Sequence, residues 1–232
     1  MEPDTSSIGV IIPAAGSGVR FGGDTPKQFL LLAGLPVIIR SVRTALQLPN
    51  LATLVIASRP EDLDYVRRLL ADHGVSDLRV HVVRGSTERQ LSVAEALRHE
   101  SMTMVQTILV HDAVRPLATI ALWGAVARAA ESYGAVVPTL PVADTLKRLD
   151  QNNAVIETVD RSSVVRVQTP QGFRSSILFA AYDSARIYGH QATDCASLVE
   201  LQDVAVTAIP GEETNFKITS PYDLEVAEFL FQ

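Results

Sequence analysis

Short apolar runs alternate with amphipathic segments along almost the whole 232-residue chain, and this alternation limits the possible folds. Runs of about four to eight apolar residues are typical of buried strands, whereas apolar spacings of three and four are typical of covering helices. Such alternation predicts an α/β, Rossmann-like fold with a mostly parallel sheet and helices on both faces. We expect strands at 10–13, 53–58, 80–83, 107–111, 135–139 and 204–210, and helices at 36–46, 61–73, 88–99, 119–132, 176–188 and 221–231.

One region, residues 140–167, departs from this alternation. Two extended pieces, 145–149 and 155–159, flank the sequence Asp150-Gln151-Asn152-Asn153. Asp and Asn are favoured in turns, so the region predicts a β-hairpin arm inserted in the α/β fold. A lone hairpin is marginally stable in water, and we therefore expect it to pack on a second subunit. No repeat or linker divides the chain, so we expect one domain over residues 1–232, with the arm as an excursion.

The first apolar run leads into a glycine-containing loop. Ile8–Pro13 continues as Ala14-Ala15-Gly16-Ser17-Gly18, and Arg20 and Lys27 follow downstream. Glycines let backbone amides approach a bound anion, and nearby cations suit phosphoryl or nucleotidyl transfer, which depends mainly on positioning and charge neutralisation. No Gly-Lys-Ser/Thr closes the loop, and Phe21 stands where a dinucleotide fingerprint has its third glycine. The segment predicts a nucleotide loop of another kind.

Two more polar segments follow predicted strands. Ligands of open α/β sheets bind beyond the carboxyl ends of strands, where His111-Asp112-Ala113-Val114-Arg115-Pro116 would lie. Asp112 could hold Mg²⁺ between nucleotide phosphates, or it could cap the next helix, while a strand-end His111 is more typical of a structural hydrogen bond. The segment 84–92, Arg-Gly-Ser-Thr-Glu-Arg-Gln-Leu-Ser, opens a helix whose amides favour anions or base edges. Taken alone, Arg89 and Lys217 are typical of solvated side chains.

The composition disfavours several classes of protein. A net charge of −6 disfavours nucleic-acid binding. The single cysteine, Cys195, rules out an intrachain disulfide and fits a reducing compartment. No apolar run reaches the roughly 18–20 residues that span a bilayer, and the first residues lack the basic start and apolar core of a signal peptide. We expect a cytoplasmic protein without nucleic-acid or membrane partners.

The motifs together resemble those of the 2-C-methyl-D-erythritol 4-phosphate cytidylyltransferases, from Ile8 to near the C-terminus. Each motif alone is only suggestive, but the ordered set is specific. The motifs are Pro13-Ala14-Ala15-Gly16-Ser17-Gly18-x-Arg20, Pro26-Lys27-Gln28, Gly85-x-x-x-Arg89-Gln90-x-Ser92-Val93, His111-Asp112-Ala113-x-Arg115-Pro116, Pro141-Val142-x-Asp144-Thr145-x-Lys147, Val159-Asp160-Arg161, Gln168-Thr169-Pro170-Gln171-x-Phe173, Thr193-Asp194 and Lys217-Ile218-Thr219.

The resemblance implies a homodimer with interlocking arms that binds CTP, Mg²⁺ and a sugar-alcohol phosphate. It implies that Arg20 and Lys27 stabilise transition-state charge, and that Arg161 and Lys217 place the attacking phosphate. The implied nucleotide-binding residues are Pro13, Ala14, Ala15, Gly16, Ser17, Gly18, Gly85, Ser86, Thr87, Arg89 and Ser92. The implied substrate-binding residues, some from the partner subunit, are Arg115, Thr145, Arg161, Thr169 and Thr193, and the implied metal ligand is Asp112.

The implied reaction is attack of the sugar phosphate on the α-phosphorus of CTP, with release of pyrophosphate, in isoprenoid precursor synthesis. A phosphate monoester with a second pKa of about 6 is already anionic at pH 7, so no general base is needed. A ribitol 5-phosphate cytidylyltransferase is the nearest alternative, although Asp144-Thr145-x-Lys147 and Val159-Asp160-Arg161 favour the methylerythritol enzymes. A glycosyltransferase would release a nucleoside diphosphate, and a non-catalytic module would bind CTP without turnover.

Overall fold

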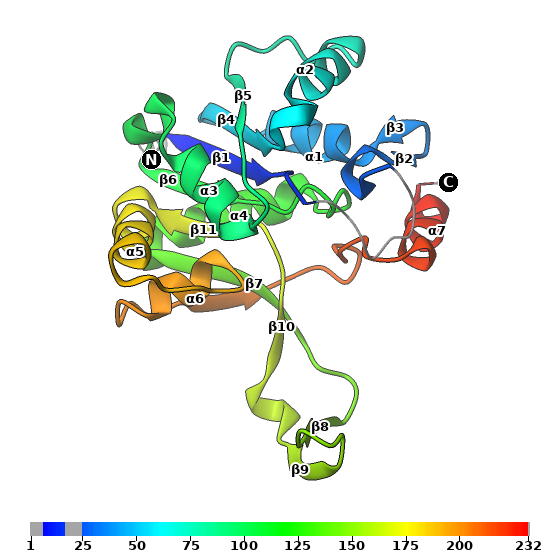
Figure 1. Cartoon of the computed structure of the whole chain (residues 1–232), viewed down its shortest axis with the longest axis vertical. Coiled ribbons are helices and arrows are strands. Elements are labelled where there is room, and N and C mark those ends of the chain that lie inside the picture. The colour runs from blue at the N-terminus through cyan, green and yellow to red at the C-terminus, as the bar shows by residue number, and fades with distance from the viewer. Residues whose placement is uncertain (1–6, 17–24, 232) are drawn as a thin grey trace.

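A twisted eight-stranded sheet forms the centre of the computed structural model, which describes residues 7–16 and 25–231 (Figure 1). The strands lie in the order β10 (Val165–Val167), β7 (Ala135–Pro141), β11 (Gln171–Arg174), β6 (Thr107–Val110), β1 (Ile8–Pro13), β4 (Leu51–Ser58) and β5 (Val80–Arg84), with β12 (Thr207–Pro210) also on β7. Strands β5, β4, β1 and β6 are parallel neighbours, as are β7 and β12. Of the eight strands, only β10 and β11 run opposite to the others, so the sheet is mostly parallel, as predicted.

Helices cover both faces of this sheet because its strands are apolar on both sides. Along β1, Val10 and Ile12 face one buried cluster and Ile11 faces the other. The first cluster includes helices α1 (Val37–Ala45), α2 (Leu63–Asp72) and α4 (Ile120–Tyr133). The second includes α3 (Arg89–Leu97), α5 (Ser175–Tyr188) and α6 (Cys195–Glu200). Burying such apolar surface is the main favourable contribution to folding.

Local signals fix where several helices begin and end. The Thr119 side chain accepts a hydrogen bond from the Leu122 amide at the start of α4, and Gly134, at φ 90°, ends that helix. Helix α7 (Pro221–Leu230) begins with a capping box between Ser220 and Asp223. The predicted start of this last helix is therefore confirmed. None of the helices in the described ranges has the length and apolar character needed to cross a bilayer.

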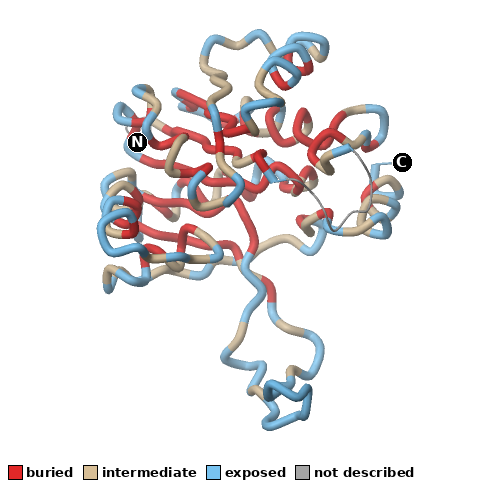
Figure 2. The backbone as a smooth tube through the Cα atoms, in the orientation of Figure 1, coloured by how far each residue is buried: buried red, intermediate tan, exposed pale blue. Residues whose placement is uncertain are grey.

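The predicted arm is an antiparallel hairpin of β8 (Leu146–Leu149) and β9 (Val155–Val159), followed by the 3₁₀ turn η5 (Arg161–Ser163). Strands β7 and β10 connect it to the sheet, and it projects well beyond the rest of the chain (Figure 1). At the predicted turn, Asp150 Oδ1 accepts hydrogen bonds from two backbone amides, each at 2.8 Å. The arm is exposed almost throughout, whereas the central strands are buried (Figure 2). Val155 and Ile156 are both 59% exposed.

Several elements were not predicted. Strand β11 has only one large apolar residue, Phe173, and its position between β6 and β7 depends on Gly172. A Cβ atom on Gly172 would lie 2.7 Å from Val126 Cγ1, so its absence lets α4 pack directly on the strand. Helix α6 was also missed, and β12 begins three residues later than expected. The remaining short elements are β2 (Leu31–Leu32), β3 (Leu35–Pro36) and the 3₁₀ turns η2 (Lys27–Phe29), η3 (Pro60–Asp62) and η4 (Glu100–Met104).

Candidate active site

A cavity of about 440 Å³ lies at the carboxyl ends of β1 and β6, where open α/β sheets bind their ligands. Its walls come from segments that are far apart in the sequence. Gln28, Ala113 and Val114 complete a lining that otherwise consists of predicted site residues. These are Pro13, Ala14, Ala15, Gly16, Lys27, Thr87, Arg89, Ser92, Asp112 and Lys217.

Gln28 holds the described part of the glycine-containing loop. Its side-chain amide donates hydrogen bonds to the carbonyl oxygens of Ala14, at 2.8 Å, and Gly16, at 3.2 Å. Only 2% of Gln28 is exposed, so the bonds are shielded from water. Sequence reasoning used Gln28 only as part of a motif and gave it no role. The predicted residues Ser17, Gly18 and Arg20 lie outside the described residues.

The loop after β5 packs tightly against the first loop. A Cβ atom on Gly85 would lie 3.0 Å from Ala15 Cβ and 3.1 Å from Ser92 Oγ, so the two loops approach closely because residue 85 is glycine. Ser92 Oγ accepts a hydrogen bond from the Ser86 amide at 3.0 Å. Ser92 therefore shapes the loop, while Thr87 lines the cavity with it.

Asp112 is the centre of a buried cluster of charges. Its Oδ1 accepts from Arg89 Nε at 2.8 Å, its Oδ2 accepts from Lys217 Nζ at 2.8 Å, and Arg115 Nε lies 3.8 Å from Oδ2. Burial alone would raise the pKa of Asp112, but the charges of Arg89 and Lys217 outweigh it and hold this pKa far below its ordinary value. The carboxylate is therefore ionised at neutral pH, and the cluster carries a net positive charge.

Arg89 and Lys217 differ from the solvated side chains that their isolated sequence signals indicate. The Arg89 side chain is 23% exposed, and its Nη1 lies 3.5 Å from Cys195 Sγ on α6. The Lys217 side chain is 37% exposed and lines the cavity. Both differences have one cause. Asp112 follows β6, Arg89 begins α3 and Lys217 lies between β12 and α7, so the sequence does not reveal which cations pair with this carboxylate.

Thr169 and Arg115, which the resemblance implies as substrate-binding residues, both have hydrogen-bond partners within the chain. The Thr169 hydroxyl accepts from the Asp112 amide at 3.0 Å and lies 3.1 Å from His111 Nδ1. Arg115 Nη1 donates to the Asn215 carbonyl at 2.7 Å. Both side chains are mostly buried and engaged in contacts within the protein. His111 is fully buried, and this burial lowers its pKa to about 4, so it is neutral at pH 7.

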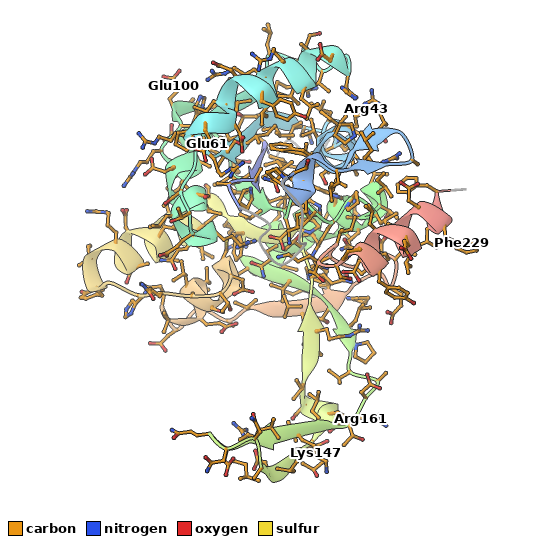
Figure 3. The ribbon with its side chains drawn as sticks, turned by 45° about the vertical axis from the view of Figure 1, so that its right-hand side comes forward. Arg43, Glu61, Glu100, Lys147, Arg161 and Phe229 are labelled. Carbon is orange, nitrogen blue, oxygen red and sulfur yellow. The ribbon has the colours of Figure 1, made fainter. Side chains whose placement is uncertain are left out.

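The remaining predicted substrate residues lie outside the cavity of their own chain. Thr145 and Arg161 are exposed on the arm, where Arg161 donates a hydrogen bond to the Ala143 carbonyl. Figure 3 shows Arg161 and Lys147 at the far end of the molecule from Arg43 and Glu61. Thr193 is exposed just before Asp194, which caps α6.

The cavity combines the cations Lys27, Arg89 and Lys217 with residues of two loops, Ala14–Gly16 and Thr87, which suits a ligand with several phosphates. A metal ion would find one carboxylate here. Within residues 7–16 and 25–231, no group of three or more His, Cys, Asp or Glu side chains could hold a metal. Asp112 nevertheless fits a nucleotide-bound Mg²⁺, because that ion takes one or two protein carboxylates and the phosphate oxygens supply other ligands.

Comparisons with known proteins point to one family. Residues 8–232 match the family model described as 2-C-methyl-D-erythritol 4-phosphate cytidylyltransferase. A protein of that name from Acidobacterium capsulatum is 40% identical over 228 residues, which cover 95% of each chain. Another from Frankia casuarinae is 42% identical over 224 residues, covering 96% of this chain and 80% of the relative.

Solved structures give the same result. The 4-diphosphocytidyl-2C-methyl-D-erythritol synthase of Anaerococcus prevotii superposes with a TM-score of 0.85 at 29% identity, covering 99% of this chain and 100% of the other. The 2-C-methyl-D-erythritol 4-phosphate cytidylyltransferase of Thermus thermophilus gives a TM-score of 0.77 at 33% identity, covering 97% and 98%.

Proposed function

Because the chain belongs to the 2-C-methyl-D-erythritol 4-phosphate cytidylyltransferase family, we propose that the cavity beyond β1 and β6 is its active site. The enzyme is a nucleotidyltransferase that joins CTP and 2-C-methyl-D-erythritol 4-phosphate in the methylerythritol phosphate pathway. The ribitol phosphate alternative is not favoured. The observation that carries the assignment of the site is the charge cluster of Asp112, Arg89 and Lys217 opposite the Gly16 loop in one cavity.

The chemistry of this reaction needs charge neutralisation more than proton transfer. The attacking phosphate is already anionic at pH 7, and it must approach the α-phosphorus of a polyanionic nucleotide. We assign Lys27 and Arg20 to the charge that develops on the phosphates, and Lys217 to the attacking phosphate. Lys27 and Lys217 both line the cavity, which supports two of these assignments.

The nucleotide is assigned to the two loops that pack around Gly85. Backbone groups of Ala14–Gly16 and Gly85–Thr87 would bind the nucleotide, and Ser92 would hold the second loop in shape. Arg89 is assigned differently from the sequence prediction. Its Nε donates to Asp112 Oδ1, so we give it the task of orienting that carboxylate rather than binding the nucleotide.

Asp112 is the proposed protein ligand of Mg²⁺. Its Oδ2 is shared with Lys217, whose side chain is partly exposed and can move aside. When bound to the nucleotide, Mg²⁺ would neutralise phosphate charge. The contribution of the chain itself is to keep the carboxylate ionised and fixed in direction, which Arg89 does from the opposite side.

We further propose a homodimer in which the arm of one subunit completes the substrate pocket of the other. The exposed apolar side chains of the arm, such as Val155 and Ile156, support this proposal because they have no buried position within their own chain. Thr145 and Arg161 would then contact the sugar phosphate of the partner, and Thr193 would complete the pocket. We keep a cytoplasmic location in the proposal because the single cysteine fits a reducing compartment.

A pyrophosphate-release assay tests the proposed function directly. With CTP and Mg²⁺, we expect pyrophosphate to appear with 2-C-methyl-D-erythritol 4-phosphate and at least tenfold more slowly with ribitol 5-phosphate at equal concentrations. Lys27→Ala should abolish most of this signal if the cavity is the active site. Binding of CTP without pyrophosphate release would contradict turnover at this site, and faster reaction with ribitol 5-phosphate would contradict the substrate.

A further inference from the structure

A closed ring of hydrogen bonds lies under the charge cluster and joins three separate segments of the chain. His111 Nε2 lies 3.0 Å from the Arg115 carbonyl oxygen, and Arg115 Nη1 donates to the Asn215 carbonyl at 2.7 Å. Asn215 Nδ2 donates to the Thr169 carbonyl at 2.9 Å, and Thr169 Oγ1 lies 3.1 Å from His111 Nδ1, which closes the ring. His111 and Asn215 are fully buried and Thr169 is 5% exposed, so water does not compete for these bonds.

The partners fix which atom of His111 carries the hydrogen. A carbonyl oxygen only accepts, so Nε2 must donate to Arg115. Thr169 Oγ1 accepts from the Asp112 amide, so its own hydrogen is available for His111 Nδ1. This arrangement satisfies every partner when Nε2 of His111 donates and Nδ1 accepts. A hydrogen on Nδ1 would direct two donors at one hydroxyl and leave the hydroxyl hydrogen without its acceptor.

The ring of hydrogen bonds fixes the backbone that bears the charged residues. His111 fixes the backbone at Arg115, and Thr169 fixes the backbone amide of Asp112. Asn215 stands two residues before Lys217 and binds both the Arg115 side chain and the Thr169 backbone. These bonds fix the relative positions of Asp112, Arg115 and Lys217. They use backbone atoms of the three residues, or of residues near them, and only one charged group, the Arg115 guanidinium.

We propose that His111 and Thr169 are positioning residues of the cytidylyl transfer, which fix the turn bearing Asp112 and Arg115 through their hydrogen bonds to the Arg115 carbonyl and the Asp112 amide. Neither residue touches the reacting atoms. The inference rests on the proposed active site, because it assigns to these residues the task of orienting Asp112. A displacement of about 1 Å in such a site can cost about 10²-fold in rate.

Nitrogen NMR of the unsubstituted protein tests the tautomer, and a variant is needed only to assign the signal. Long-range ¹H–¹⁵N spectra of protein labelled in histidine report which ring nitrogen carries hydrogen, and His111→Gln identifies the signal among the five histidines. We expect a hydrogen on Nε2, where it is donated to the Arg115 carbonyl. A ring with its hydrogen on Nδ1 alone would overturn the inference, because Nε2 could not then donate to that carbonyl.

Kinetics of Thr169 variants test the positioning role. Thr169→Val leaves the Asp112 amide and His111 Nδ1 unpaired, and we expect kcat to fall by about tenfold to a hundredfold with an almost unchanged KM for CTP. Thr169→Ser restores the hydroxyl and should return kcat to within about threefold of the unsubstituted enzyme. Thr53→Val is the matched control, because Thr53 is 1% exposed in β4 and its hydroxyl contacts Ser101 at 2.7 Å.

The control separates positioning from stability. We expect both valine variants to lower the melting temperature, whereas only Thr169→Val should lower kcat at 25 °C. A kcat for Thr169→Val equal to that of Thr53→Val, or a Thr169→Ser variant as slow as Thr169→Val, would overturn the inference. If either result accompanies an Asp112→Asn variant that needs about tenfold more Mg²⁺ for half-maximal rate, only the positioning role fails. An Asp112→Asn variant with an unchanged Mg²⁺ requirement would overturn the proposed role of Asp112 together with the positioning role.

Discussion

The charged residues of the cavity and those of the arm have opposite environments. Asp112 has a side chain only 10% exposed, and Arg89 and Lys217 each lie 2.8 Å from one of its oxygens. On the arm, Arg148 pairs with Glu157 while both side chains remain more than half exposed. The same types of residue are therefore fixed in direction in one region and surrounded by water in the other.

This difference separates side chains whose positions are fixed within the chain from side chains whose positions are not. Buried charges need partners and hydrogen bonds, so the cavity charges have defined positions in the chain by itself. Exposed pairs contribute about 0–1 kcal/mol and do not fix geometry. The arm has apolar side chains that are more than half exposed, and the proposed dimer would cover them with a surface of the partner subunit.

Loss of a cavity cation should produce the largest effect. We expect Lys27→Ala to lower kcat by about 10²–10³-fold while CTP binding and the melting temperature change little, since one donor to developing charge is lost. Steady-state kinetics and calorimetric CTP titration measure this. Arg43→Ala serves as the control, because Arg43 is exposed and far from the arm (Figure 3). A kcat near that of the unsubstituted enzyme would remove Lys27 from the mechanism.

Mixing two inactive variants tests whether the two regions meet across subunits. An Arg161→Ala chain and a Lys27→Ala chain should each be nearly inactive alone. If the arm serves the partner, each hybrid dimer has one site with both residues intact, and activity should rise to about a quarter of the unsubstituted value after subunit exchange.

The exchange itself must be verified with differently tagged subunits. Confirmed hybrids without any recovery would mean that Arg161 serves its own subunit or none, and the shared pocket would be wrong.

Asp112→Asn should change the metal requirement. A neutral amide is a poor ligand for Mg²⁺, so we expect about tenfold more Mg²⁺ to be needed for half-maximal rate. A Mg²⁺ titration of both enzymes at saturating CTP measures the shift. Superimposable titration curves would contradict the assignment of Asp112 as the ligand.

The smallest effect is expected on the exposed arm. In the arm, hydrogen bonds from the Ser162 amide and hydroxyl lower the pKa of the Asp160 carboxyl. Since the bound form is the carboxylate, the capped turn at Arg161–Ser163 is present above the ordinary pKa and is lost as the pH falls through the lowered one.

Carboxyl NMR titration should find the Asp160 midpoint below the ordinary value for an aspartate. Ser162→Ala removes the hydroxyl donor and should raise the Asp160 midpoint. An unshifted Asp160 midpoint in the variant would show that the Ser162 hydroxyl does not stabilise the carboxylate.

Sequence reasoning was most accurate where a signal is local. The helix cap at Ser220, the turn at Asp150 and the alternation of strands depend on neighbouring residues, and all three are present. Strand β11 was missed because it packs against α4 through Gly172, and the sequence near Gly172 does not show that α4 lies there.

The same limit applies to the candidate site. The motifs located the cavity, since most of its lining residues were predicted. The pairing of Arg89 with Asp112 and the burial of Thr169 could not be read from spacing, because each joins elements distant in the chain. Gln28 was overlooked for the same reason, since its partners are backbone oxygens of the preceding loop.

Strand β10, which connects the arm to the sheet, has a mechanical consequence. Beyond β10 the chain passes through Gln168, whose side chain is 3% exposed and hydrogen-bonded to the backbone of Glu212 and Asn215. The next residue, Thr169, holds the Asp112 amide. Buried hydrogen bonds therefore fix the root of the arm, and a force transmitted along β10 would act on the segment that also supports the Asp112 backbone.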